Sequence, residues 1–278
     1  MVRPRMTAHV QNVGRTAFVI AYCRMRETES PTPLFSDHLA HLFLDQDTEE
    51  TAKSIAQLAH STEHLVSYRT CYFDRQLMKQ LENKVKQVVI VGAGLDTRAI
   101  RFDVPGVQFY EIDEGSVIDF KRTRLESHGY TVNSRLVSCN YLRENWIDLL
   151  VSQGFDLSVR TYIIWEGNSM YIAESDIVRL MTSMLQQIAD FAVSFDYITN
   201  RLLKSLVPIG GSQRLLQGFS DLGAPWITGF DQITTLLAPV GLRMIEDHLL
   251  VEWGQQYRHD RRLDPRVFSY YRICTAGV

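Results

Sequence analysis

The sequence has no long apolar segment, no marked excess of either charge and no cysteine pattern typical of a bound metal. A net charge of -3 over 278 residues gives no electrostatic basis for binding nucleic acid or an anionic membrane. The run "AFVIAYC" near the N-terminus is too short for a membrane span or a secretory signal core. We therefore expect a cytoplasmic protein that binds neither nucleic acid nor a membrane.

The four cysteines lie far apart, and none belongs to a Cys-x-x-Cys pair. This spacing disfavours a disulfide framework and a cysteine-based metal site, so we expect free thiols. His60 and His64 have the i, i+4 spacing of two ligands on one helix face, but no further ligand cluster accompanies them. We expect a solvated pair of histidines and no metal.

The order of apolar and polar residues predicts an α/β protein. Residues 1–84 carry helical spacing without a convincing strand and are expected to form a helical N-terminal extension. Residues 85–278 alternate β-rich runs with amphipathic segments, as in a doubly wound, mostly parallel sheet. Within them, about residues 200–229 break the alternation and are expected to form an inserted lid. The final run, 268–277, is expected to pair antiparallel with the run before it at the sheet edge.

The run "VVIVGAGLDTRAIRF" places Gly92 and Gly94 between a predicted strand and a predicted helix, where a ligand can approach the backbone. The dinucleotide fingerprint G-x-G-x-x-G/A is incomplete, because Thr97 stands at its last position. Asp96 falls at the start of the helix, where a carboxylate would repel a pyrophosphate. S-adenosylmethionine (SAM) has no phosphate and tolerates Asp96. The pattern favours SAM over NAD, although Asp96 and Thr97 would cap the helix with either ligand.

Asp113 ends the next predicted strand, about 20 residues beyond the turn. An acidic side chain at this place can accept hydrogen bonds from both ribose hydroxyls of a nucleoside. NAD and SAM share that ribose, so Asp113 does not choose between them. Glu111 is expected to point to the same side, but Asp113 is nearer the carboxyl end of the strand and is the better candidate. A solvated carboxylate at a strand end is the alternative.

Five segments carry a family resemblance. In chain order they are "GRTAFVIAYCRMRETESPTPLFSDHLAHLF", "SYRTCYFD", "VVIVGAGLDTRAIRF", "FYEID" and "WEGNSMYI". Together they resemble the leucine carboxyl methyltransferase family, which includes O-methyltransferases of polyketide and peptide biosynthesis. The resemblance runs from about residue 14 to the C-terminus, where "YYRICTAG" is similar to the closing strand of the family. It implies a class I SAM-dependent methyltransferase fold, with S-adenosylhomocysteine (SAH) as the product of SAM.

The resemblance also implies a set of cofactor-binding residues. Arg69 matches the arginine that binds the SAM carboxylate, which a guanidinium can hold with two parallel hydrogen bonds. Gly92 matches the glycine whose backbone approaches the methionine part, and Asp113 matches the ribose-binding acid. Asn140 and Tyr141 stand where the family has an Asp-Leu pair near the adenine. At that departure, an Asn carbonyl still accepts a hydrogen bond, and a Tyr can stack where Leu would pack.

Glu166 in "WEGNSMYI" matches the family glutamate near the SAM ammonium or sulfonium, where a carboxylate is electrostatically favourable. Arg24 or Arg26 is expected to add a second contact to the SAM carboxylate. Methyl transfer to a carboxylate needs no base, whereas a hydroxyl acceptor benefits from one. The catalytic residues stay unknown. His248, Asp196 and Tyr197 lie near strand ends, and a structural role is favoured for each.

The lid carries apolar residues that would form either the wall of a pocket for a bulky apolar acceptor or a packed cap over the sheet. They are Leu202, Leu203, Leu206, Leu215, Phe219 and Trp226.

The expected function is that of a SAM-dependent O-methyltransferase. Its acceptor would be a hydroxyl or carboxyl of a small natural product, such as a polyketide or peptide-polyketide intermediate, free or tethered to a carrier. Methylation of a protein C-terminal carboxylate is the second hypothesis, disfavoured because the N-terminal segment looks more like the biosynthetic branch. An NAD-dependent oxidoreductase is disfavoured by Asp96 and Thr97. A non-catalytic SAM-binding module is separated from these only by an assay of methyl transfer.

Overall fold

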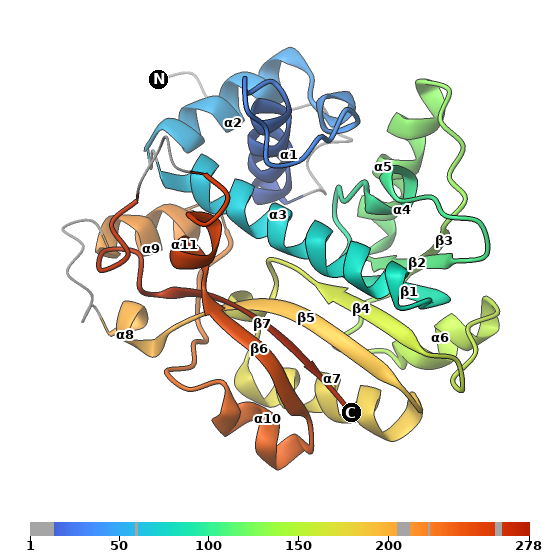
Figure 1. The fold of residues 1–278 in the computed structure, drawn as a ribbon. Coiled ribbons are helices and arrows are strands. Elements are labelled where there is room, and N and C mark those ends of the chain that lie inside the picture. Colours follow the sequence, from blue (N-terminus) through green and yellow to red (C-terminus); the bar gives the residue numbers. More distant parts are fainter. Residues whose placement is uncertain (1–13, 59–60, 205–211, 222, 259–262) are drawn as a thin grey trace.

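A seven-stranded sheet runs through the computed structural model, which describes residues 14–58, 61–204, 212–221, 223–258 and 263–278 (Figure 1). The strands are β1 (Gln87–Val91), β2 (Gln108–Asp113), β3 (Arg135–Ser138), β4 (Thr161–Trp165), β5 (Phe191–Ile198), β6 (Arg243–Leu249) and β7 (Tyr271–Gly277). Their order across the sheet is β3-β2-β1-β4-β5-β7-β6. Strands β1 to β5 pair in parallel, and β7 is antiparallel to both β5 and β6.

Helices cover both faces of this sheet. The α-helices are α1 (Arg15–Thr28), α2 (Gln46–Leu58), α3 (Ser61–Glu82), α4 (Arg98–Arg101), α5 (Gly115–Ser127), α6 (Trp146–Ser152), α7 (Glu174–Gln187), α8 (Asn200–Leu203), α9 (Ser212–Asp221), α10 (Thr234–Val240) and α11 (Leu250–Gly254). Two 3-10 helices are η1 (Ala40–Phe43) and η2 (Ser169–Tyr171). Figure 1 shows α3 running across one face of the sheet, with α7 and α10 on the other. None of the helices in the described ranges is both long and apolar enough to cross a membrane.

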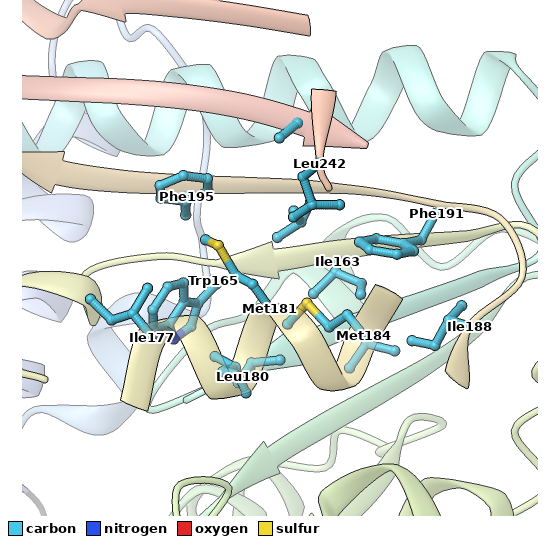
Figure 2. Packing of buried hydrophobic residues seen from close by; sticks show 14 of the residues in the cluster. Ile163, Trp165, Ile177, Leu180, Met181, Met184, Ile188, Phe191, Phe195 and Leu242 are labelled. Atoms are coloured by element: carbon cyan, nitrogen blue, oxygen red, sulfur yellow. The ribbon is translucent and has the colours of Figure 1, made fainter. Parts of the chain in front are cut away.

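The continuous apolar run of β1 is buried on both sides. Val88 and Ile90 belong to the hydrophobic cluster that contains the side chains of α3 and α11, whereas Val89 and Val91 belong to the cluster of α6, α7 and α10. Figure 2 shows the second cluster, in which Met181 of α7 lies between its helix and the strands. Each large apolar side chain buried in this way contributes about 1.5–3 kcal/mol to folding. A strand without a polar face is therefore stable only between two helical layers.

The predicted fold class is confirmed, with a mostly parallel, doubly wound sheet and an antiparallel hairpin at its C-terminal edge. Within that hairpin, β7 is the inner strand and β6 the outer one. The residues explain this order, because β7 is almost wholly buried, whereas β6 exposes Arg243, Met244 and Ile245. A strand with charged and exposed residues suits an edge, where it has one neighbour and solvent on the other side.

The segment expected to form a lid contains α8 and α9 and then a loop that returns to the sheet. Leu202 is completely buried, and Leu203 and Trp226 are partly buried against the cluster beneath α3. Leu206 and the side chain of Leu215 lie outside the described residues. The separation of a helical extension, a core and a lid stays a prediction.

Candidate functional site

The strand order reverses between β1 and β4, and this switch point is where open α/β sheets bind their ligands. Two turns meet there. One is the glycine turn after β1, which begins at Gly92, and the other is the segment of Glu166, Gly167 and Asn168 after β4. Both follow the carboxyl ends of neighbouring parallel strands, so the two turns lie side by side at the same edge of the sheet.

The turn after β1 favours glycine at positions 92 and 94 because both have a positive φ, and at position 92 also because a side chain would not fit. Gly92 has φ +64°, and a Cβ atom added to it would lie 2.6 Å from the Oδ1 atom of Asn168. Gly94 has φ +50°, and its backbone N–H donates to Oδ2 of Asp113 at 2.6 Å. The turn after β1 is therefore tied to the end of β2 through the Asp113 carboxylate.

Asp113 lies where the sequence places it, at the carboxyl end of β2. Its Oδ1 atom accepts a hydrogen bond from the backbone N–H of Glu114 at 2.7 Å, and burial raises the pKa of the carboxyl. Each carboxylate oxygen has a second lone pair, which can accept a ribose hydroxyl. Glu111 is engaged elsewhere, because it is buried and paired with Lys121. Asp113 is thus the better placed of the two acids for a ligand.

Arg69 of α3 reaches the two carboxylates that stand at the ends of β4 and β5. Its Nε atom donates to Oε1 of Glu166 at 2.9 Å, and its Nη1 atom lies 3.5 Å from Oδ2 of Asp196. Nη1 also donates to the hydroxyl of Tyr271 at 2.9 Å. Among the described residues the structure assigns no hydrogen-bond partner to Nη2 of Arg69, so this edge of the guanidinium can still bind an anion.

Arg98 of α4 is a central residue that the sequence analysis missed. It is 1% exposed and pairs with Asp74 at 2.6 Å, Asp96 at 2.5 Å and Glu166 at 2.6 Å. Burial opposes ionisation of Glu166, but Arg98 and then Arg69 hold the pKa of this carboxyl below its usual value. In the sequence, the only sign of this role is that Arg98 follows Asp96 by two positions, in the turn after the predicted strand.

Asp96 does accept a hydrogen bond at the start of α4, from the backbone N–H of Arg98 at 2.7 Å. Burial would raise the pKa of Asp96, but Arg98, with Lys121 and Arg24, lowers it to about 2. Its charge is therefore offset inside the protein. Asp96 alone discriminates less against a pyrophosphate than its place in the sequence suggests.

These groups are part of a longer chain of charges, here called the buried ionic chain. Its members are Arg24, Asp37, Arg101, Asp74, Arg98, Asp96, Glu166, Arg69 and Asp196. Four guanidinium groups face five carboxylates, so one negative charge is in excess when Asp196, whose pKa is raised by burial, is ionised like the others. A ligand with one net positive charge would balance this chain.

Of the two N-terminal arginines, Arg24 belongs to this chain and Arg26 does not. Arg24 donates to the backbone carbonyl of Leu95 in the glycine turn at 2.6 Å. Arg26 is exposed and pairs with Glu29 on its own helix.

Asn140 and Tyr141 follow β3, and the structure brings the second of them to the switch point. The Tyr141 hydroxyl donates to Oδ1 of Asn168 at 3.2 Å. The side-chain oxygen of Asn140 accepts a local hydrogen bond from the N–H of Leu142, also at 3.2 Å.

The three candidate bases are all engaged. Asp196 is fully buried, accepts from the hydroxyl of Tyr271 at 2.5 Å, and has a pKa raised by burial. Tyr197 donates to Asp247 on the opposite face of the sheet, and His248 lies on edge strand β6 beside Glu246. In the described ranges no group of three or more potential ligands could hold a metal ion.

Comparisons with known proteins agree on one family. The family described as "Leucine carboxyl methyltransferase" matches residues 17–185. A protein of Mycobacteroides abscessus, named as a candidate S-adenosyl-L-methionine-dependent methyltransferase, is 35% identical over 188 residues, covering 63% of each chain. A protein of Mycobacterium avium with the same name is 36% identical over 183 residues, covering 58% of this chain and 57% of its own. The match thus spans less than two thirds of these relatives.

Two solved structures share the fold. A candidate methyltransferase of Thermobifida fusca aligns with a TM-score of 0.66 at 12% identity, covering 97% of both chains. A DUF574 family protein of Streptomyces avermitilis aligns with a TM-score of 0.67 at 10% identity, covering 96% of this chain and 98% of its own. At these identities the likeness shows the fold alone.

Proposed function

Because the chain belongs to the leucine carboxyl methyltransferase family, we propose that it transfers the methyl group of SAM to an oxygen atom of a small molecule. The observation that carries this proposal is the excess negative charge of the buried ionic chain at the switch point. SAM has an ammonium, a sulfonium and a carboxylate, so its one net positive charge complements that excess. NAD carries a pyrophosphate and would add to it.

The residues at the switch point fit the parts of SAM. Arg69 would bind the carboxylate through its remaining N–H groups, and Glu166 would face a positive centre. Asp113 would accept the ribose hydroxyls, and Tyr141, with Asn140 beside it, would border the adenine. Gly92 would leave its backbone accessible to the methionine part.

Bound SAM supplies an activated methyl group, so the protein mainly has to align the acceptor oxygen and exclude water. Arg98 and Arg69 contribute by holding Glu166 ionised and fixed in place. A carboxylate acceptor agrees best with the site, because Asp196 is fully buried, Tyr197 donates to Asp247 on the opposite face of the sheet, and His248 lies on the outermost strand β6. A hydroxyl acceptor would need a base that these three residues do not offer.

For the acceptor we propose a small natural product with a carboxyl or hydroxyl group, free or carrier-tethered, methylated in the cytoplasm. The apolar side chains of Phe219 and Trp226, stacked at 4.3 Å, support a bulky apolar acceptor beside the strand ends. Trp226 also packs against Tyr271, which contacts Arg69, so this apolar surface adjoins the buried ionic chain.

The test is transfer of labelled methyl groups from SAM to a panel of aromatic and aliphatic carboxylic acids, phenols and a peptide with a C-terminal leucine. Methyl esters of the small acids would support the proposal. Labelling of the peptide alone would favour the protein-modifying hypothesis. Micromolar binding of SAM without any transfer to the panel would favour a binding module.

A further inference from the structure

Asn168 lies at the switch point, between the ends of β4 and β1. Its Nδ2 atom donates to the backbone carbonyl of Glu166 at 2.8 Å and, more weakly, to that of Val91 at 3.4 Å. One carbonyl follows β4 and the other ends β1. The side chain thus spans the carboxyl ends of two neighbouring parallel strands.

The other end of the same carboxamide holds Tyr141. Oδ1 of Asn168 accepts the Tyr141 hydroxyl at 3.2 Å. The contact needs a side chain with N–H donors at one end and an acceptor at the other, which a carboxamide provides. Aspartate would keep the acceptor for Tyr141 and lose the donors, whereas leucine of similar shape would lose both.

Asn168 also explains the glycine at position 92. A Cβ atom at Gly92 would lie 2.6 Å from Oδ1, 2.7 Å from Nδ2 and 2.9 Å from Cγ of Asn168. These distances are far below van der Waals contact, so the carboxamide packs directly on the Gly92 backbone. The absence of a side chain at position 92 makes room for this amide as well as for a ligand.

We infer that Asn168 is a positioning residue, which couples Tyr141 on the adenine side of the site to Gly92 and Glu166 on the methionine side. The inference rests on the proposed SAM site. Through its hydrogen bond Asn168 fixes the orientation of the Tyr141 ring, and through its packing it fixes the glycine turn. Removal of the carboxamide frees both sides together.

The experiment is a double-mutant cycle with Asn168→Leu and Tyr141→Phe, measured by calorimetric titration with SAH and with adenosine. Tyr141→Phe is expected to weaken SAH binding by about 3- to 10-fold, the range for one hydrogen bond, and Asn168→Leu by at least as much, because it also removes the hydrogen bonds of Nδ2. The double variant is expected to bind as weakly as Asn168→Leu alone, because the Tyr141 hydroxyl has then already lost its carboxamide acceptor. Adenosine is expected to follow SAH, since the affected ring borders the adenine.

Asn168→Asp provides the rescue. In this background the hydroxyl keeps its acceptor, so Tyr141→Phe should again weaken SAH binding. The controls are Asn83→Leu and Tyr130→Phe, two exposed residues away from the carboxyl ends of the strands, which should leave binding unchanged. Urea unfolding checks each variant, and Asn168→Ala replaces the leucine variant in the cycle if leucine prevents folding.

The outcomes separate this inference from the proposed function. Wild-type protein that binds SAH, combined with losses that multiply in the double variant, would refute the coupling and leave the SAM site standing. Wild-type protein that does not bind SAH would overturn the proposed function and the positioning role with it.

Discussion

Arg98 pairs with three carboxylates of the buried ionic chain, so its replacement by methionine should destabilise the protein strongly. The methionine keeps the apolar part of the side chain and removes the charge next to Asp74, Asp96 and Glu166. Asp74 retains Arg101 and Glu166 retains Arg69, but Asp96 loses its direct partner. Leaving a buried charge unpaired costs about 3–5 kcal/mol, which is a large share of the roughly 5–15 kcal/mol that stabilises a typical domain.

The loss should also depend on pH. In the wild type, Arg98 and its neighbours lower the pKa of Asp96 from 3.8 to about 2. The ionised carboxylate therefore contributes stability that is present above pH 3.8 and lost as the pH falls through about 2. In Arg98→Met burial is opposed only by the more distant Lys121 and Arg24 and by the backbone N–H of residue 98, so the pKa of Asp96 rises and protonation relieves the unpaired charge. The difference between the two proteins should be largest near pH 7 and shrink toward pH 5.

Urea unfolding at a series of pH values measures this difference in the free energy of unfolding. Arg122→Met is a matched control, because Arg122 is 44% exposed and lies 3.7 Å from Asp119 on the surface of α5. The control should change the free energy of unfolding by less than about 0.5 kcal/mol. A loss below about 1 kcal/mol for Arg98→Met, or one that does not vary with pH, would show that Arg98 does not compensate the charge of Asp96.

Three further changes probe the proposed site. Asp113→Ala removes charged hydrogen bonds worth about 1.5–3 kcal/mol to the ribose, so calorimetry should show SAM binding roughly 10- to 100-fold weaker; unchanged affinity would place the nucleoside elsewhere. Glu166→Gln removes the excess negative charge, so SAM affinity should fall about tenfold more than that of SAH, which lacks the sulfonium; equal losses would contradict the charge argument. Gly92→Ala forces a Cβ atom into Asn168 at φ +64° and should cost about 1–3 kcal/mol in urea unfolding; a neutral effect would show that the turn adapts.

Local features of the sequence predicted the sheet and the turn at its centre. The run of Val88 to Val91 is buried on both faces as its composition indicates, and Gly92 and Gly94 do occupy positions with positive φ. Such features depend on neighbours in the sequence, so periodicity reveals them. The order of β6 and β7 is explained only when the burial of the two whole strands is compared, because either strand of the hairpin could have paired with β5.

The ionic partners could not be predicted in the same way. Arg98 and Asp74 are separated by 24 positions, and Arg69 and Glu166 by 97 positions. In isolation each arginine reads as a surface residue of a helix, since burial of a charge is determined by tertiary partners. Asn168 was missed for the same reason, as its two ends bind β1 and Tyr141 only after the sheet has formed. The six cofactor residues named from the resemblance stay predictions until binding is measured.

Binding of SAM at the switch point is tested by calorimetric titration of the wild-type protein with SAM, SAH and NAD(H). We expect micromolar binding of SAM and SAH and no binding of NAD or NADH. Binding of NAD(H) alone would contradict this expectation, because the excess negative charge at the strand ends would then not select the ligand.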